Sequence, residues 1–290
     1  MEGPESLRQL LHQLATAEGV DKVAKPVSSK VAEVIGQGPV KDFLSGTWTG
    51  HPLHPVLTDL PIGFWTSSFM LDLVGGERSA AASRRLIGLG ILSAVPTAAS
   101  GLSDWSDTLG EERRIGTVHA VANVVALWFY SWSWLARRRS RGAGVVLGFL
   151  GAAAASAGGY LGGHLVYRQG VGPDRNAWKH GGEDWVQVAD DLALADGKPM
   201  VVAVGGDDVL LAKTPAGVIA AISNVCGHAG GPLDEGDFDA QGCVTCPWHG
   251  SVFRVADGHV VHGPATGHQP RYEVRSEGGR LLVRRLRSPL

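Results

Sequence analysis

Cysteine is scarce in this chain of 290 residues, because only three occur and all lie in the last quarter. So few cysteines cannot form a disulfide framework for the whole chain, and we interpret them as chemically active. An excess of basic residues is also missing, since 26 Lys and Arg residues face 28 Asp and Glu residues and the formal net charge is -2. Without a positive surface to neutralise phosphates, nucleic acid is not an expected partner.

The N-terminal segment, residues 1–47, lacks the apolar stretch of a secretory signal peptide. It opens instead with Leu7, Leu10, Leu11 and Leu14 at helical spacing, followed by a polar segment rich in lysine. We therefore predict an amphipathic and polar segment without a cleavable signal peptide.

Four apolar runs follow: residues 56–74, 86–102, 115–136 and 143–166. The last three contain no Asp, Glu, Lys or Arg. The first run is the exception, with Asp59 and Asp72 near its ends. Each run approaches or exceeds the roughly 17 to 25 residues that a membrane-spanning helix needs. We predict a four-helix transmembrane domain over residues 48–172 in a lipid bilayer. The alternative is a soluble bundle of very apolar helices, which the two uncharged runs of more than twenty residues oppose.

The composition changes after residue 172. Residues 173–183 contain Pro, Asp, Asn, Lys and Gly, which is typical of a linker. Short runs rich in β-branched residues, separated by glycine-containing turns, then predict a small all-β domain over residues 184–290. The expected fold class is multidomain, with an all-α four-helix transmembrane bundle followed by this all-β domain.

Two short loops of the β region each combine a cysteine with a histidine. The sequence reads Cys226-Gly-His228 and, after seventeen residues, Cys246-Pro-Trp-His249. Thiolates are soft ligands suited to iron and sulfide, and imidazole is a neutral ligand, so two of each favour an asymmetric iron-sulfur cluster. A structural Cys2His2 zinc site is the alternative, but zinc fingers usually separate the cysteine pair from the histidine pair.

These residues resemble the signature of the Rieske family, C-x-H and C-x-x-H separated by fifteen or more residues, over roughly the last 105 residues. The run Gly250-Ser-Val-Phe253 and the later Gly263-Pro-Ala265 are similar to those of Rieske ferredoxins and the ferredoxin-like domains of ring-hydroxylating systems. The resemblance implies a 2Fe-2S cluster that carries single electrons, with four ligands: Cys226, His228, Cys246 and His249.

The sequence departs from the Rieske subunits of cytochrome bc complexes. Those subunits resemble this motif but have an extra cysteine in each loop, and a disulfide joins the two. At the corresponding positions this chain has Gly231 and Trp248. Ser251 matches a serine that donates to the cluster in that subtype, whereas Phe253 replaces a tyrosine donor. We therefore expect a reduction potential in the lower part of the Rieske range of about -150 to +300 mV. Cys243 is interpreted as a buried strand cysteine outside the motif.

The predicted bundle opens with Gly50-His-Pro-Leu-His-Pro55, which resembles a family of uncharacterised bacterial four-helix membrane proteins with this signature. In an up-down bundle, four histidines would lie on one membrane face, beside the following cluster domain: His51, His54, His119 and His164. Histidine is an axial ligand of haem, so these residues are candidate ligands of haem b or a metal ion. A quinone pocket is a further hypothesis, and the alternative is interfacial histidines satisfied by water, headgroups or helix ends.

These features predict a membrane-bound electron carrier between a reductase or quinol and a partner protein or a bundle cofactor. Such a protein is an electron-transfer component of an oxidoreductase system rather than a stand-alone enzyme. The alternatives are a redox sensor or transport protein, and the electron-donating component of a separate oxygenase. An oxygenase itself would need a mononuclear iron site in a large catalytic domain.

Loop charges, a possible export signal and the cysteines bear on the side of the cell membrane on which the cluster domain lies. Arginine counts in the short loops do not decide it once the flanking residues are included. Arg137-Arg138-Arg139 before the last helix could act as an internal twin-arginine export signal, which favours the outside. The lack of a bracing disulfide and the unpaired Cys243 suit a reducing compartment, and we favour the cytoplasmic side.

Overall fold

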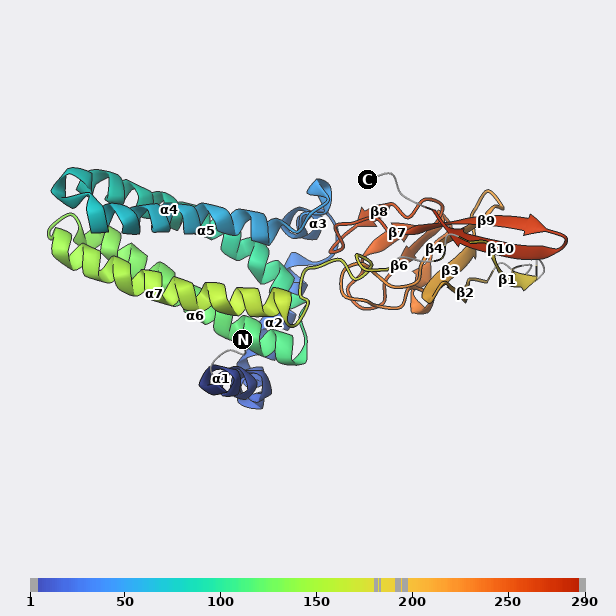
Figure 1. The fold of residues 1–290 in the computed structure, drawn as a ribbon, viewed down its shortest axis with the longest axis horizontal. Coiled ribbons are helices and arrows are strands. Elements are labelled where there is room, and N and C mark those ends of the chain that lie inside the picture. The colour runs from blue at the N-terminus through green and yellow to red at the C-terminus, as the bar shows by residue number, and fades with distance from the viewer. Residues whose placement is uncertain (1–4, 180–181, 183, 191–193, 195–197, 287–290) are drawn as a thin grey trace. The chain divides into compact units, whose positions relative to one another are not determined.

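The computed structural model describes all residues except 1–4, 180–181, 183, 191–193, 195–197 and 287–290 (Figure 1). The chain divides into two compact units. The helical unit consists of Met1–Gly36 and Leu53–Val171, and the β unit consists of Gln37–Pro52 and Gly172–Leu290. The chain therefore leaves the helical unit once, contributes a short segment to the β unit, and returns.

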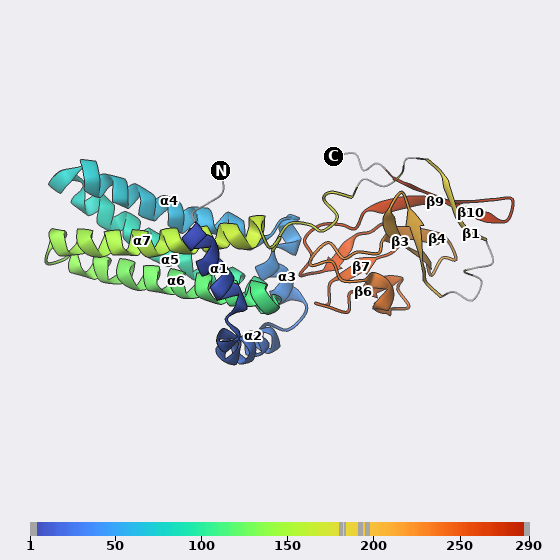
Figure 2. The same ribbon diagram turned by 60° about the horizontal axis from the view of Figure 1, so that its bottom comes forward.

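The described residues of the helical unit form six α-helices, which are coloured from blue to yellow-green in Figure 1: α1 (Glu5–Thr16), α2 (Asp21–Ile35), α4 (Leu53–Val74), α5 (Ala80–Ser106), α6 (Gly110–Ala136) and α7 (Arg141–Tyr167). Helices α4 and α5 run side by side as one hairpin, and α6 and α7 as a second (Figures 1 and 2). The predicted four-helix bundle is thus confirmed as α4 to α7.

Among the helices that the structure describes, three are long and apolar enough to cross a membrane: Gly76–Ser106, Gly110–Ala136 and Arg141–Tyr167. Their outer surfaces suit lipid, since Leu92 is 70% and Val124 66% exposed. Helix α4, with 22 residues, is not in this group and contains Asp59 and Asp72. Its place in the bundle comes from packing along α5.

Helix α4 also contains a proline, and its neighbour compensates for the missing hydrogen bond. Pro61 has no N–H to donate to the carbonyl of Leu57, four residues earlier. The hydroxyl of Thr97 in α5 lies 3.1 Å from that carbonyl and 2.9 Å from the carbonyl of Ser93 in its own helix, so the two carbonyls share its one hydrogen. The partner helix thereby partly satisfies the carbonyl that the proline leaves without a donor.

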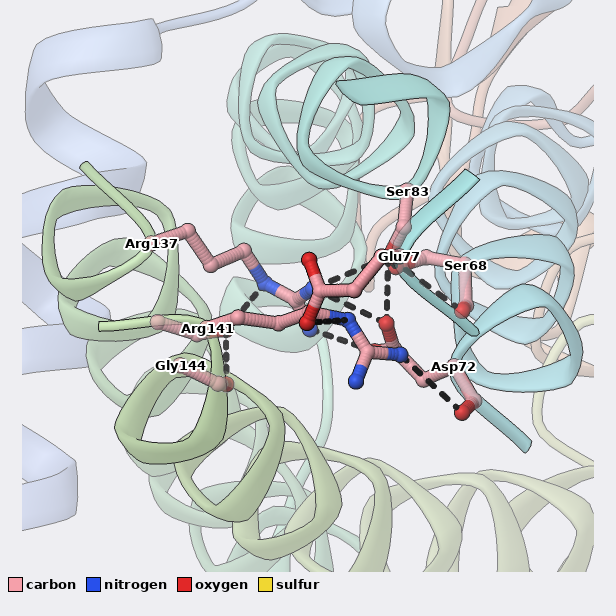
Figure 3. Close-up of polar contacts among 8 residues, drawn as sticks. Ser68, Asp72, Glu77, Ser83, Arg137, Arg141 and Gly144 are labelled. Atoms are coloured by element: carbon pink, nitrogen blue, oxygen red, sulfur yellow. Dashed lines mark hydrogen bonds and ion pairs between the residues drawn. The ribbon is translucent and has the colours of Figure 1, made fainter. Parts of the chain in front are cut away.

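The two hairpins are joined by a buried ion pair. Asp72 of α4 accepts from Arg137 at the end of α6, and both side chains are 3% exposed (Figure 3). Ser83 of α5 donates to the same carboxylate at 2.9 Å, and Ser133 donates to the carbonyl of Gly144 in α7 at 2.6 Å. One polar cluster therefore involves all four helices, and removing either charge would leave the other buried without its counter-ion.

The N-terminal helices α1 and α2 pack against one end of this bundle. Leu11 and Ala15 of α1 share a core with Ile115 of α6. Asp21 of α2 accepts from Arg114 of α6 at 2.9 Å. The predicted amphipathic segment is thus helical and uses its apolar face to cover α6.

Ten strands are formed by the residues of the β unit that the structure describes: β1 (Val186–Asp190), β2 (Met200–Val204), β3 (Asp207–Lys213), β4 (Ile219–Ser223), β5 (Asp237–Phe238), β6 (Cys243–Thr245), β7 (Val252–Arg254), β8 (Val260–His262), β9 (Arg271–Glu277) and β10 (Arg280–Arg285). They form an antiparallel six-stranded sheet in the order β1-β10-β9-β4-β3-β2 and a four-stranded sheet in the order β5-β6-β7-β8. The predicted all-β domain is confirmed.

Strand β3 is buried on both faces because successive side chains point in opposite directions. Val209 and Leu211 belong to a core on one side of the large sheet. Leu210 belongs to the other core, together with Leu233 and Phe253 near the small sheet. This second core also holds the cysteines of the two predicted ligand loops.

The structure draws two domain boundaries differently from the composition. The segment 37–52, which carries helix α3 (Pro39–Ser45), belongs to the β unit rather than to the N-terminal segment or the bundle. Asp42 in α3 accepts from the backbone N–H of Gly263 at 2.7 Å and contacts Nδ1 of His262 at 2.9 Å. These bonds join residues 221 and 220 positions apart, so no local pattern announces them.

The predicted linker, residues 173–183, also begins inside the β unit. The N–H of Arg175 donates to the carbonyl of Gly227 at 2.9 Å. Asn176, 4% exposed, donates to the carbonyl of Val225 at 2.9 Å and accepts from Ser223 at 2.8 Å. A stretch rich in turn-forming residues is thus held by hydrogen bonds of its side chains and backbone.

Candidate metal centre

The two Cys-His loops follow strands β4 and β6 and close in the same way. In each loop the cysteine N–H donates to the carbonyl five residues later, and the cysteine carbonyl accepts from a glycine four residues later, at 2.8 to 3.0 Å. Those glycines, Gly230 and Gly250, have φ of 90° and 74°, which other residues rarely adopt. Each loop is therefore a tight turn that presents Cys226 or Cys246 together with its nearby histidine.

The four predicted ligands lie together in two pairs. Cys226 and Cys246 are 1% and 2% exposed, and their thiols are hydrogen bonded to each other. The rings of His228 and His249 lie 4.9 Å apart at 88°. In the part of the chain that the structure describes, no three His, Cys, Asp or Glu side chains are grouped to hold one metal ion.

This two-and-two division fits a cluster with two irons, one bound by thiolates and one by imidazoles, and not a tetrahedral zinc ion that all four residues would share. Sulfide and thiolate ligands also need hydrogen-bond donors. The backbone N–H groups of His228 and Ala229 point at the sulfur of Cys226, and those of Trp248 and His249 at Cys246. The residues present therefore fit a 2Fe-2S cluster, and the role of each as a ligand stays a prediction.

Metal binding needs thiolates and neutral imidazoles, and Cys246 and His228 are already in those states, whereas Cys226 would lose its proton on binding. The hydrogen bond from Cys226 lowers the pKa of Cys246 to about 6, and the same contact with burial raises the pKa of Cys226. Burial, together with the nearby charges of His249, Lys41 and Arg175, lowers the pKa of His228 to about 3. His228 is thus a neutral imidazole near pH 7.

The structure explains why a disulfide-forming residue is missing from the first loop. A Cβ atom added to Gly231 would lie 2.8 Å from the sulfur of Cys246 and 3.0 Å from the ring of Trp248. All three cysteines are free thiols. Cys243 is in strand β6, as expected, but it is half-buried rather than buried, and partial burial together with the charge of Asp239 raises the pKa of its thiol.

The two residues on which the expected potential depends lie in the cluster core. The hydroxyl oxygen of Ser251 is fully buried and accepts from the N–H of Ala265 at 2.9 Å, so its own hydrogen remains available for donation. Phe253 is fully buried in the core that contains Cys226 and Cys246, and it has no hydroxyl to donate.

Segment 37–52 contributes residues that sequence reasoning missed. Gln37 donates to the carbonyl of His249 at 3.1 Å, and Thr47 donates to the carbonyl of Ala265 at 3.1 Å. Lys41, 3% exposed, acts electrostatically on His228. Gln37 and His249 are 212 positions apart, and no spacing rule connects them.

Of the four histidines predicted for the membrane region, the structure brings two together. The rings of His54 in α4 and His119 in α6 lie 6.4 Å apart at 85°. His164 is half-buried near the end of α7, and within the described residues it has no ring contact with this pair. His51 is exposed and belongs to the β unit.

Comparison with known families agrees with this division of the chain. The family described as Rieske [2Fe-2S] domain matches residues 184–273. The family described as Predicted membrane protein (DUF2231) matches residues 50–175.

Known relatives match the β unit. The carnitine monooxygenase oxygenase subunit of Escherichia coli (strain K12) is 33% identical over 95 residues, which are 31% of this chain and 25% of that protein. The ferredoxin component of the naphthalene 1,2-dioxygenase system of Pseudomonas aeruginosa is 27% identical over 101 residues, 35% of this chain and 95% of that protein. The chain thus spans about a quarter of the length of the oxygenase subunit.

Among solved structures, the ferredoxin of carbazole 1,9a-dioxygenase from Nocardioides aromaticivorans IC177 is 34% identical and has a TM-score of 0.32, covering 34% of this chain and 95% of that one. The cofactor of the β unit is a 2Fe-2S cluster, and the apolar helices place the protein in a membrane. This chain therefore combines a Rieske 2Fe-2S domain with a domain of the predicted membrane protein family.

Proposed function

We propose that the protein is a membrane-bound carrier of single electrons, which takes them from a reductase or quinol and delivers them to a partner protein or to a cofactor of the helical unit. The observation that carries this proposal is the pairing of two buried thiols with two adjacent imidazoles on matched loops. The ferredoxin component of the naphthalene 1,2-dioxygenase system is covered over 95% of its length, and this match supports the role of an electron carrier.

The residues have distinct roles in this proposal. Cys226 and Cys246 would hold one iron, and His228 and His249 would hold the other. When bound, the cluster supplies one-electron oxidation and reduction at the imidazole-bound iron. The buried thiols and the loop amides exclude water from the sulfur side, while Trp248, 55% exposed, offers a surface beside His249 where a partner can approach.

The potential of the cluster is set by opposing influences in this proposal. Phe253 offers no hydrogen bond where a tyrosine would stabilise the reduced state. The positive charges of Lys41 and Arg175 near His228 favour the reduced state. We place the reduction potential of the cluster in the lower part of the Rieske range of about -150 to +300 mV. A variant that lacks the charge of Lys41 or Arg175 should have a lower reduction potential than the wild type.

A second candidate function is electron donation to a separate oxygenase polypeptide. The match to the naphthalene dioxygenase ferredoxin component over 95% of its length favours it. In both versions we place the β unit on the cytoplasmic side, because no disulfide braces the ligand loops and Cys243, which lies outside the donor set, is an unpaired thiol. A reporter fused after residue 290 checks this placement, since activity of a periplasm-specific reporter there would contradict it.

The test of the carrier function uses the full chain purified in detergent. We expect iron and sulfide in equal amounts, an EPR signal on one-electron reduction, and reduction of the cluster by an added quinol or by a cytoplasmic reductase. Cys226→Ser should remove the signal, and Cys243→Ser should keep it because Cys243 lies outside the donor set. A protein without iron and sulfide, or a cluster that neither donor reduces, would contradict the proposal.

A further inference from the structure

The helical unit consists of two similar halves, the hairpin α4–α5 and the hairpin α6–α7. In the first helix of each hairpin, residues with matching contacts are always 65 positions apart: His54 and His119, Trp65 and Tyr130, Ser68 and Ser133, Asp72 and Arg137. In the second helix the matching residues are always 61 positions apart: Ser83 and Gly144, Gly90 and Gly151, Thr97 and Gly158, Gly101 and Gly162.

Each half holds its histidine by the same two contacts. Nδ1 of His54 is 3.0 Å from the carbonyl oxygen of Thr97, and the ring lies against Gly101, where an added Cβ would come within 2.5 Å. Nδ1 of His119 is 2.8 Å from the carbonyl oxygen of Gly158, and its ring lies against the glycine four residues later, at 3.1 Å from an added Cβ. The glycines allow each ring to lie directly on the neighbouring helix.

Matching aromatic residues follow the same rule. Trp65 lies against Gly90, and Tyr130 lies against Gly151, where an added Cβ would come within 2.2 Å and 3.1 Å of the rings. The two halves are therefore built from the same layers, with one side chain of the first helix resting on one glycine of the second. This repetition indicates that the histidines are placed by the fold and are not incidental to it.

Matching residues of the two halves also meet each other. Asp72 and Arg137 form the buried ion pair shown in Figure 3. The rings of Trp65 and Tyr130 stack at 4.2 Å with an angle of 14°. In the third layer the imidazoles of the histidine pair remain wider apart, at 6.4 Å, and nearly perpendicular. Two layers are closed by direct contact, and the third leaves two imidazoles edge to face without a hydrogen bond between them in the described structure.

The hydrogen bonds determine which nitrogen of each ring is available. A carbonyl oxygen can only accept, so Nδ1 of both His54 and His119 carries the hydrogen. Nε2 of each neutral ring then carries the lone pair, and that of His119 lies 3.3 Å from the amide nitrogen of Asn123, a contact that a bond to a metal would replace. A ligating histidine usually donates its other N–H to a carbonyl or carboxylate in this way, which orients the ring and strengthens the ligand.

We propose that His54 and His119 are the two axial ligands of a haem iron held between the halves of the bundle. A metal lies about 2.0 to 2.1 Å from a ligating imidazole nitrogen, so the centres of two imidazoles on opposite sides of one metal are about 6 Å apart. The observed separation of 6.4 Å agrees with this arrangement. Within the described residues no third His, Cys, Asp or Glu joins the pair, so the metal must bring its remaining ligands. A porphyrin supplies four nitrogens in its plane and leaves two axial positions open.

This inference deepens the proposed function, because the haem is the bundle cofactor that exchanges electrons with the cluster. One electron from the reduced cluster converts ferric haem to ferrous haem, and the cluster returns to its oxidised state, with no bond to carbon, hydrogen or oxygen changed. The electron enters from the quinol or reductase named above. Binding of the haem itself does not depend on that exchange, and the two can be tested separately.

The test measures haem in the full chain, produced with a haem precursor in the medium, incubated with haemin and purified in detergent. We expect about one b-type haem per chain by the pyridine haemochrome assay. His54→Ala and His119→Ala should each lower the haem content at least tenfold, since loss of even an outer-shell partner costs 10- to 100-fold in metal affinity. His164→Ala is the matched control, a membrane histidine outside the pair, and should keep the haem.

A variant that loses haem because it is misfolded is identified by rescue. His119→Gly should regain the haem absorption band when imidazole is added, and an unfolded bundle would not. Wild-type protein with less than a tenth of a haem per chain, or full haem retention in His54→Ala, would overturn the inference. The EPR signal of the cluster is measured in the same samples. Absence of haem together with an intact, quinol-reducible cluster would refute only the haem proposal. Absence of the cluster with haem retained would refute only the carrier function.

Discussion

The two units build their candidate sites by repetition, but over very different distances along the chain. In the β unit, each loop closes through backbone hydrogen bonds between residues four and five positions apart, and each delivers a cysteine with its histidine. In the helical unit, the repeated element is a whole hairpin, and His54 and His119 are 65 positions apart. The first site therefore depends on local turns, and the second depends on packing between helices.

This difference has a consequence for how each site responds to change. The cluster loops are stabilised by backbone bonds that a side-chain substitution outside the loops does not touch. The histidine pair is held by ring contacts with glycines and by a buried polar cluster at another level of the bundle. Substitutions in the helical unit should therefore disturb its pair from a distance, whereas the cluster should respond to near neighbours only.

The largest effect is expected from loss of a cluster thiolate. Cys246→Ser should abolish the cluster, because the hydroxyl is a poor replacement for a buried thiolate ligand. Iron and sulfide analysis with EPR measures it, and Cys243→Ser should match the wild type. The melting temperature of the helical unit should stay unchanged in both variants. A variant that loses the cluster and also shows a lower melting temperature of the helical unit would indicate that the stabilities of the two units are coupled.

The next effect is expected from the buried ion pair. Asp72→Ala should lower the free energy of unfolding of the helical unit by about 3–5 kcal/mol, because it leaves the charge of Arg137 buried without its partner. Unfolding in detergent, followed by circular dichroism, measures the change. Lys30→Met is the control, since the Lys30–Glu33 pair is 66% and 70% exposed and should contribute about 0–1 kcal/mol. Equal effects of the two variants would contradict the prediction.

A smaller effect is expected from a methyl group on the glycine below His54. Gly101→Ala should destabilise the helical unit by about 1–3 kcal/mol, because the new Cβ would lie 2.5 Å from the ring. Gly159→Ala, which has no atom within 4 Å, should stabilise the helix by up to about 1 kcal/mol through helix propensity. Thermal unfolding of both variants compares them, and a neutral Gly101→Ala would argue against direct packing of the ring.

The charge of Lys41 is expected to tune the cluster without holding it. Lys41→Met should lower the midpoint potential by about 30–60 mV, a three- to tenfold change in the equilibrium constant for one electron, because a buried positive charge near His228 favours reduction. Potentiometric titration followed by EPR measures the shift. Lys41→Arg keeps the charge and should remain near the wild-type value, and an identical shift in both variants would indicate a packing effect instead.

The smallest effect is expected from an exposed pair of the β unit. The hydrogen bond from Arg254 lowers the pKa of Asp257, so this carboxylate stabilises the folded state above its unfolded pKa. The contribution is lost as the pH falls through the lowered folded value, and exposure limits it to less than about 1 kcal/mol. Urea unfolding at pH 7 and pH 3 should show that Asp257→Asn matters at pH 7 and not at pH 3. A larger loss at pH 3 would reverse the sign of the expected linkage.

Much of the architecture could be predicted from the chain itself. Uncharged apolar runs require a bilayer or a deep core, and they locate α5, α6 and α7. The Cys-His loops could be read directly because the ligands of each are two or three residues apart, and a turn of that length has few conformations. The repeat within the bundle also left a signal, since His54 precedes Trp65 by 11 positions and His119 precedes Tyr130 by the same number.

Other features depend on tertiary structure. Sequence alone placed His51, His54, His119 and His164 on one face, and only packing selected the pair His54 and His119. Gln37 contacts the cluster loop of His249 across 212 positions of the chain, and Asp42 of the same segment contacts His262 across 220 positions.

The chain by itself determined what each site is made of, because residue types and short spacings govern local turns and the chemistry of ligands. The tertiary structure decided which distant residues share a site. Contacts such as that of His54 with His119 arise only when an entire helix is positioned against another, and many side chains along both helices contribute to that positioning.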